Sequence, residues 1–292
     1  MPPLIPNQNT LSHPDPFFSV RVRMDNLSPP LVGVCAGYEL TEWRCNQLAS
    51  HLIEWLPEFA LTDTEREAIR DHNAIARVAQ AARSIYTSDK WQRRGEPGEL
   101  LLHAIIRQVF ETVPAISKYY FKDSANDTVK GFDSVHIIAS DAELQLWLGE
   151  VKFYNEIGRA ITDVVTELQA HTQRDYLRGE FASINNKIDD NGRHAARLKK
   201  LLHRNTSLDE IFDAVCIPVL LTYDSPTIEN HTAVTADFQR AFEQEVLRHR
   251  DTFAAKALPT NLKIHLFLLP LKSKAELMQR FDEKLKACQA IA

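Results

Sequence analysis

Three charged residues lie in two apolar stretches that follow one another in the chain. Asp133 belongs to residues 130–139, and Glu150 and Lys152 belong to residues 144–154. Both stretches are rich in β-branched and aromatic residues, and the polar residues between them predict the turn of a hairpin. Side chains alternate across a strand, so Glu150 and Lys152 share one face. Because buried charges are costly unless they are paired or hold a metal, the three residues indicate a site.

A simpler explanation of the Glu-x-Lys spacing is an ion pair on a solvated face of a sheet. The order of the charges favours a site instead, because a glutamate on the preceding helix, Glu99, comes before the aspartate and the Glu-x-Lys triplet. That helix, predicted over residues 99–110, is apolar on nearly all sides and is expected to be buried. Glu99 lies in its first turn, where a carboxylate also complements the helix N-terminus. His103, one turn further on, is expected to be a core histidine.

Length and composition describe an ordinary globular protein. The chain has 292 residues, of which 44% are hydrophobic and 25% charged, so it can bury a sizeable core. It contains no apolar run of about 18 residues and no signal-peptide pattern, so we expect a cytoplasmic protein with no membrane partner. Its four cysteines lack the C-x-x-C spacing of a zinc site. The net charge of −5 does not by itself indicate a nucleic-acid-binding protein.

The first part of the chain predicts strands and helices without chemistry of their own. These elements are strands at residues 17–24 and 31–38, a helix at residues 42–56 that ends before Pro57, and a long amphipathic helix that starts at the capping box of residues 62–65 and continues to Ile85. The composition then changes sharply to a basic segment followed by glycines and a proline. We therefore expect an N-terminal packing or partner-binding layer at residues 1–90 and a core at residues 91–292.

The rest of the chain alternates between helices and strands. The predicted elements are a helix at residues 156–178, a doubly buried strand at 212–223, a helix at 235–258, a strand at 262–269 and a terminal helix capped by Ser273. Within residues 212–223, Pro218 predicts an edge or bulged position, since proline cannot donate to a ladder. This alternation predicts an α/β fold with a mixed sheet flanked by helices.

Polar and basic residues that follow the hairpin are candidates for contacts with DNA. Gln169 and Gln173 lie toward the end of the helix at residues 156–178. Further on, basic residues recur at helical spacing, namely Arg193, Arg197, Lys200 and Arg204. Such a stripe is either a solvated helix face or a surface that follows phosphates without reading the base sequence.

The arrangement of the motifs resembles a known family. A buried helix with Glu99, a strand with Asp133, a Glu150-Val151-Lys152 strand and a further helix is the order found in PD-(D/E)xK, or restriction-endonuclease-like, nucleases. Four blocks, at residues 81–86, 94–103, 130–134 and 146–154, resemble the nuclease subunit of the Hachiman anti-phage defence system, the HamA family. The resemblance extends from about residue 35 to the end of the chain. One departure is that a phenylalanine, and no proline, precedes Asp133.

The resemblance implies a metal-dependent DNA nuclease with a PD-(D/E)xK core and an N-terminal elaboration of strands and helices. Asp133, Glu150 and the backbone carbonyl of Val151 would then hold Mg²⁺ or Mn²⁺. Glu99 would reach a second metal or its water shell. Lys152 would orient and polarise the attacking water. The family further implies a partner, a superfamily-2 helicase subunit (HamB-like), and this chain has no G-x-x-x-x-G-K-[ST] motif with which to supply the ATPase itself.

Two other functions are compatible with parts of the pattern. A non-catalytic adaptor with a degenerate nuclease fold would bind the helicase and DNA, although such a protein has no reason to keep three costly buried charges. An acid-pair glycosidase would need two facing carboxylates, and Lys152 is expected to lower the pKa of Glu150 where a general acid needs a raised one. The nuclease interpretation is therefore preferred.

Overall fold

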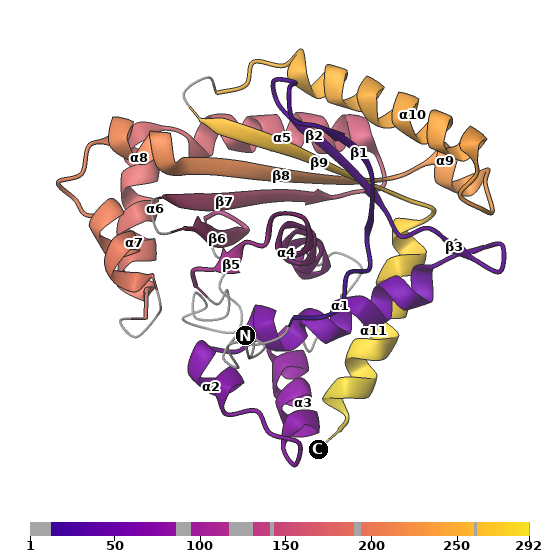
Figure 1. Cartoon of the computed structure of the whole chain (residues 1–292), viewed down its shortest axis with the longest axis horizontal. Helices are drawn as coiled ribbons and strands as arrows, with labels where there is room; N and C mark the ends of the chain where they lie inside the picture. The colour runs from indigo at the N-terminus through magenta and orange to yellow at the C-terminus, as the bar shows by residue number, and fades with distance from the viewer. Residues whose placement is uncertain are drawn as a thin grey trace, which may run out of the picture.

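The computed structural model describes residues 13–85, 95–116, 131–140, 143–189, 194–259 and 262–291. Seven strands form one mixed sheet in the order β1-β2-β9-β8-β7-β6-β5 (Figure 1), and β3 pairs with β4 in a separate hairpin. The strands are β1 Ser19–Met24, β2 Leu31–Cys35, β3 Tyr38–Glu39, β4 Glu42–Trp43, β5 Val113–Pro114, β6 Ser134–Ala139, β7 Leu144–Phe153, β8 Val215–Asp224 and β9 Lys263–Leu271. The α/β class and the mixed sheet flanked by helices are thereby confirmed.

Four parallel strands form the centre of the sheet. β2, β9, β8 and β7 run parallel, whereas β1, β6 and β5 pair with their neighbours in antiparallel fashion. The hairpin predicted around the charged residues is the β6–β7 pair, in which Ser134 lies opposite Gly149. β8 is buried on both faces until its last residue, which explains its continuous apolar sequence.

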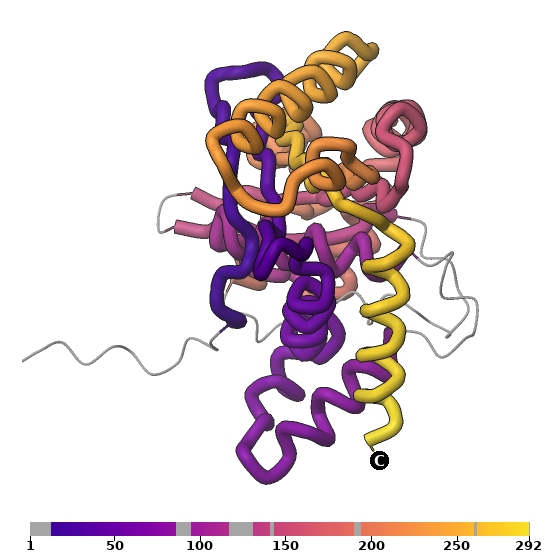
Figure 2. The backbone as a smooth tube through the Cα atoms, turned by 90° about the vertical axis from the view of Figure 1, so that its right-hand side faces the viewer, coloured from indigo at the N-terminus to yellow at the C-terminus, as the bar shows by residue number. Residues whose placement is uncertain are grey.

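Helices cover both faces of the sheet (Figure 1), and the helices at the two ends of the chain lie side by side below it (Figure 2). α4 packs on one face and is backed by α1, against which α3 and α11 pack in turn, while α5 and α10 cover the other face. The helices are α1 Cys45–Ala60, α2 Asp63–Glu67, α3 Ala74–Ile85, α4 Glu96–Phe110, α5 Ile157–His171, α6 Arg174–Lys187, α7 Ala195–Leu201, α8 Leu208–Ala214, α9 Pro226–Glu229, α10 Ala236–Ala254 and α11 Lys274–Gln289. In the part of the chain that the structure describes, no helix is long and apolar enough to cross a membrane.

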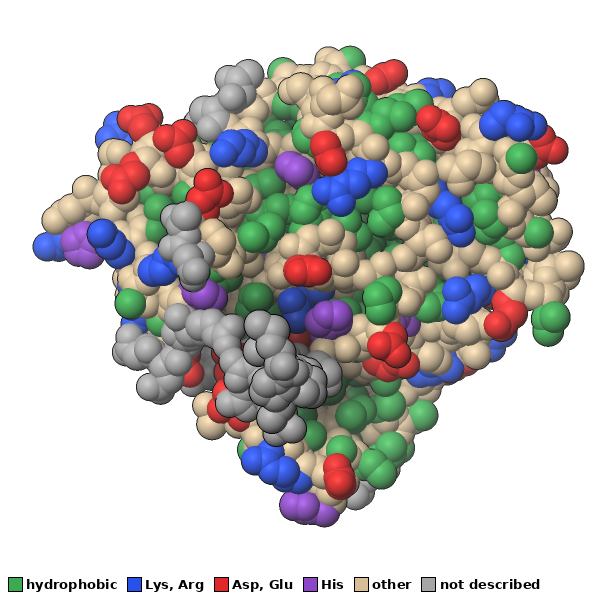
Figure 3. Space-filling view, in the orientation of Figure 1, with side chains coloured by type: hydrophobic (Ala, Val, Ile, Leu, Met, Phe, Trp, Pro, Cys, Tyr) green, Lys and Arg blue, Asp and Glu red, His purple; other side chains and the backbone are tan. Residues whose placement is uncertain are grey.

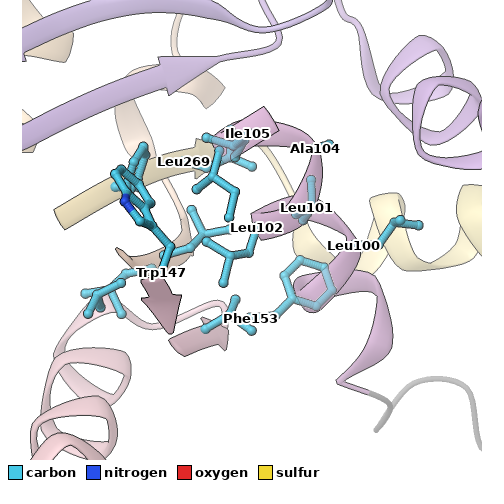
Figure 4. Close-up of a cluster of buried hydrophobic side chains, with 14 of the residues drawn as sticks. Leu100, Leu101, Leu102, Ala104, Ile105, Trp147, Phe153 and Leu269 are labelled. Atoms are coloured by element: carbon cyan, nitrogen blue, oxygen red, sulfur yellow. The ribbon is translucent and has the colours of Figure 1, made fainter. Parts of the chain in front are cut away.

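Helix α4 is buried and packs closely against β7. Its first turn, which carries Glu99, therefore lies beside this strand. Its leucines and Ile105 are almost completely buried, and Leu102 and Ile105 face side chains of the sheet such as Trp147 and Leu269 (Figure 4). Two glycines permit this close approach. A Cβ atom added to Gly98 would lie 2.6 Å from Cβ of Phe153, and one added to Gly149 would lie 2.6 Å from Cδ2 of Leu102. Larger residues at either position would push the helix away from the strand.

The N-terminal predictions are correct for the strands and only partly correct for the helices. Helix α1 begins at Cys45 and continues through Pro57 to Ala60, so the predicted end before Pro57 is wrong. The capping box at Thr62 is confirmed, but α2 ends after five residues. The single long helix is wrong because Asn73 closes a turn. Its Oδ1 accepts from the backbone N–H of Arg70 at 2.7 Å before α3 begins.

Three predictions for the second half also need correction. The helix expected over residues 156–178 is two helices, α5 and α6, because Gln173 has an extended backbone. The strand expected from residue 212 begins at Val215, because α8 occupies residues 208–214. Pro218 lies in a central strand and not at an edge or bulge. It pairs with His265 of β9. On the β7 side Pro218 itself has no paired residue, but Cys216 before it and Val219 after it pair with β7 in the same register.

The layer expected at residues 1–90 shares its core with the rest of the chain. β1 and β2 extend the central sheet beside β9, and the apolar residues of α1 belong to the same buried cluster as those of α4 and β7. α11, from the C-terminal end, packs against α1 and α3. The boundary near residue 90 itself stays a prediction.

Candidate functional site

The residues predicted to be catalytic or to hold a metal meet at one open pocket of about 500 Å³ at the C-terminal end of β7, between α4, α5 and α11. Glu99, Asp133, Glu150, Val151 and Lys152 all line it. The hairpin supplies most of them, and α4 supplies Glu99 from the opposite side. The other lining residues are Gly95, Gly131, Phe153, Tyr154, Glu167, His171, Tyr176 and Lys274.

Asp133 is held at the open end of the hairpin. It lies one residue before β6, and its backbone N–H donates to the carbonyl of Gly149 at 2.8 Å. Its Oδ2 accepts from the backbone N–H of Val151 at 2.8 Å. Its carboxylate also lies near that of Glu150, and its negative charge raises the pKa of Glu150.

Glu150 is almost completely buried, with 1% of its surface exposed. Burial raises its pKa to about 7, and Asp133 adds to this shift, whereas His171 and Lys152 oppose it. The predicted influence of Lys152 therefore has the right direction, but desolvation outweighs it. Nδ1 of His171 lies 2.5 Å from Oε1 of Glu150, and this hydrogen bond with its charge outweighs burial and raises the pKa of His171. The hydrogen bond therefore favours the ionised carboxylate of Glu150 and the protonated imidazole of His171.

Lys152 is also paired with a residue of α5. Its ammonium donates a hydrogen bond to Oε2 of Glu167. Burial alone would lower the pKa of Lys152, but Glu167, Asp133 and Glu150 together raise it. Lys152 consequently stays protonated at neutral pH. It can polarise a water or a phosphate as a cation, and it cannot act as a neutral base.

Glu167 and His171 are site residues that the sequence analysis missed, as is Lys274 of α11. The first two are four residues apart on α5 and so lie one above the other, facing Glu150 and Lys152 of β7. The sequence feature that could have identified them is an acidic residue and a histidine four residues apart at the edge of the apolar face of a predicted helix. The predicted Gln169 is two residues away, about 200° round the helix, and its amide donates to the carbonyl of Ala257. Gln169 and Gln173 are both exposed outside the pocket.

Helix α6 contributes an aromatic wall. Tyr176 stacks on the ring of His171 with centroids 4.5 Å apart and an angle of 9°. Its hydroxyl is buried and has no hydrogen-bond partner among the described residues. Glu180, one turn further on, lies against Gly131, where an added Cβ would come within 2.6 Å of Oε1. Burial raises the pKa of both Tyr176 and Glu180.

None of the described residues of the predicted basic stripe lines this pocket. Arg197 donates to the carbonyl of Ser140 at 2.6 Å and so braces the turn of the hairpin. Lys200 and Arg204 are exposed, Arg204 lies beyond the end of α7, and Arg193 falls outside the described residues. On the face drawn in Figure 3, basic and acidic side chains are interspersed.

The donor set of the pocket suits some metals better than others. The described residues contain no group of three or more His, Cys, Asp or Glu side chains that could hold a metal ion. The pocket instead brings together two carboxylates, Asp133 and Glu150, beside the backbone of Val151. Mg²⁺ is commonly bound through one or two carboxylates and keeps several waters. The residues present therefore fit Mg²⁺, and they do not fit a metal that needs a closed protein cage.

Comparison with known proteins identifies the family. The model of the HamA family matches residues 15–285. The chain is 26% identical over 279 residues to Anti-bacteriophage protein A of Escherichia coli (strain K12), an alignment that covers 88% of this chain and 50% of that relative. It thus spans about half the length of the curated relative it matches. Because the family model covers nearly the whole sequence, the chain belongs to the HamA family.

Proposed function

We propose that this protein is a metal-dependent DNA nuclease of the PD-(D/E)xK type. The observation that carries the proposal is the meeting of Asp133, Glu150 and Lys152 in one pocket at the end of an antiparallel hairpin, with Glu99 entering from the preceding helix. Two neighbouring carboxylates and a protonated lysine are the groups that phosphodiester hydrolysis needs.

We propose further that the nuclease acts in anti-phage defence in the cytoplasm. Membership of the HamA family supports this role, as does the name of the relative from Escherichia coli, Anti-bacteriophage protein A. The chain has no G-x-x-x-x-G-K-[ST] motif. The proposal therefore assigns ATP-driven movement along DNA to a superfamily-2 helicase partner.

In the proposed mechanism, Asp133, Glu150 and the carbonyl of Val151 would hold Mg²⁺ or Mn²⁺, and Glu99 would reach a second metal or its water shell. The bound metal supplies charge at the phosphate and makes a water more acidic. Lys152, kept protonated by its acidic neighbours, orients the attacking water and stabilises negative charge that develops at the phosphate.

The residues of α5 keep these groups in the required states. Glu150 would be partly protonated at neutral pH, because burial raises its pKa to about 7. The hydrogen bond and charge of His171 favour the ionised form, which is the form that binds a cation. Glu167 holds the ammonium of Lys152 at the wall of the pocket and limits its rotation.

A non-catalytic adaptor is the second candidate, because the described structure already pairs both charged groups of β7. Glu150 is bonded to His171 and Lys152 to Glu167. An adaptor would use these pairs to stabilise the fold and would bind DNA and the helicase without cutting.

Cleavage assays distinguish the two candidates. Supercoiled plasmid and linear double- and single-stranded DNA are incubated with Mg²⁺ or Mn²⁺ and the wild-type protein, Glu150→Gln or Lys152→Met. Glu143→Gln, on an exposed residue of the same hairpin, serves as the matched control. We expect both pocket variants to lose at least about 10²-fold in rate and the control to keep it. If the wild type binds DNA but does not cut it, even when the helicase and ATP are present, the adaptor function would be established.

A further inference from the structure

A second lysine lines the pocket from the far end of the chain. Lys274 is the first residue of α11, and its Nζ lies 4.9 Å from the centroid of the Phe153 ring and 5.9 Å from that of Tyr154. Phe153 directly follows Lys152 in β7. Lys274 is therefore beside the residues of the proposed catalytic site, although more than 120 residues separate it from them in sequence.

The ammonium of Lys274 has no ion-pair partner among the described residues. Lys152, by contrast, has an ion pair with Glu167. The nearest acid in electrostatic terms is Asp224, whose Oδ1 accepts from the backbone N–H of Lys274 at 2.6 Å. Asp224 thus serves the first turn of α11 and leaves the side-chain ammonium available.

The surroundings of Lys274 make an uncompensated charge costly. Burial lowers its pKa, and Arg159 lowers it further, while Asp224 opposes the shift. Arg159 itself lies over the outer ring, with Cζ 5.2 Å from the centroid of Tyr154. Two cations therefore lie beside Tyr154, and of the two only Lys274 lines the pocket. Such a half-buried cation in a cleft is stabilised when an anion binds beside it.

We propose that Lys274 binds a backbone phosphate of the nucleic-acid strand that enters this pocket, next to the phosphate at which the proposed cleavage takes place. A phosphodiester suits the site because an ammonium binds phosphate as a point charge without a fixed geometry. The aromatic rings below it hold the aliphatic part of the lysine chain in place. This assignment rests on the proposed nucleic-acid substrate and adds a contact that strengthens binding without reading the base sequence.

The test measures binding separately from cleavage. Fluorescence anisotropy of a fluorescein-labelled DNA duplex, and of one of its single strands, is recorded in EDTA over about 50 to 200 mM salt. The proteins are the full wild-type chain, Lys274→Met, which keeps the aliphatic chain over Phe153, Lys274→Arg, which keeps the charge, and Lys272→Met. Lys272 is exposed, lies two residues earlier and does not line the pocket, so it is the matched control.

We expect Lys274→Met to weaken binding roughly tenfold and to reduce the slope of log K against log salt by about one, as the loss of one phosphate contact does. Lys274→Arg and Lys272→Met should stay close to wild type. Thermal unfolding of Lys274→Met checks that its fold is intact.

Three outcomes separate this proposal from the nuclease proposal. If Lys274→Met keeps the wild-type affinity and salt slope, or weakens binding no more than Lys272→Met, the phosphate site is overturned, while any metal-dependent cleavage is unaffected. If the wild type binds neither DNA probe, the phosphate site is likewise overturned. If binding depends on Lys274 but no DNA is cut, the phosphate site stands and the nuclease proposal fails.

Discussion

A buried ion pair between Glu58 and Arg107 links α1 to α4, and its geometry indicates how much free energy of unfolding is lost when it is broken. Arg107 is 8% exposed and grips the carboxylate of Glu58 with two nitrogens. Nε donates to Oε1 at 2.5 Å and Nη2 donates to Oε2 at 3.2 Å. Nη1 also donates to the carbonyl of Thr112. Burial alone would raise the pKa of Glu58, but His103 and Arg107 hold it well below its usual value.

Substitution of Arg107 by methionine keeps much of the side-chain volume and removes the charge. Loss of one partner of a buried ion pair costs about 3–5 kcal/mol, because the other charge is left without compensation. Arg66, whose Nη1 is 3.1 Å from Oε2 of Glu58, and His103 remain beside the carboxylate. We therefore expect Arg107→Met to lower the free energy of unfolding by about 3 kcal/mol, at the lower end of that range.

Urea unfolding followed by far-UV circular dichroism measures this cost, provided that the slope with denaturant is unchanged. Arg280→Met is the control, because Arg280 pairs at 3.4 Å with Glu283 on the surface, where such pairs contribute less than about 1 kcal/mol. The double variant Glu58→Gln/Arg107→Met should be more stable than the sum of the two single variants predicts. A cost for Arg107→Met equal to that of Arg280→Met, or strict additivity in the double variant, would refute the reasoning.

Two further predictions concern packing and pH. Gly149→Ala should lower the free energy of unfolding by about 1–3 kcal/mol in the same assay, because its Cβ would lie 2.1 Å from Oγ of Ser134. Gly179→Ala, where nothing lies within 4 Å, should be neutral or stabilising, and equal costs at the two glycines would contradict this. Burial lowers the folded-state pKa of His103 and His136 below the ordinary 6.5. The unfolded chain therefore binds protons that the folded chain does not, and stability falls as pH drops through about 6.5, by up to about 1.4 kcal/mol per pH unit for each histidine. His136→Asn should reduce the pH slope measured by urea unfolding, and an unchanged slope would show that His136 is protonated in the folded state.

Patterns between residues close in sequence predicted most of the elements. Residue types and the polar turn predicted β6 and β7 as a hairpin, and the caps at Thr62 and Ser273 predicted where α2 and α11 begin. The predicted helix end before Pro57 was wrong. Phe59 and Ala60 are buried in the core, and their burial stabilises the last turn of α1 although Pro57 has no backbone N–H to donate. In the same way, the central strand β8 tolerates Pro218. Residues before and after it in the strand pair with β7, and Pro218 itself pairs with His265 of β9.

For the site, the types and order of the residues that the hairpin and α4 bring to the pocket could be read from the sequence alone. The register of a hairpin follows from local alternation and the turn, so Asp133 and Glu150 come together whatever surrounds them. The groups that compensate these charges follow from the packing of distant helices against the sheet. His171 and Glu167 reach β7 from α5, and Lys274 arrives from α11. The face of a helix that meets a strand depends on the packing of the whole sheet, and no local pattern in the sequence specifies it.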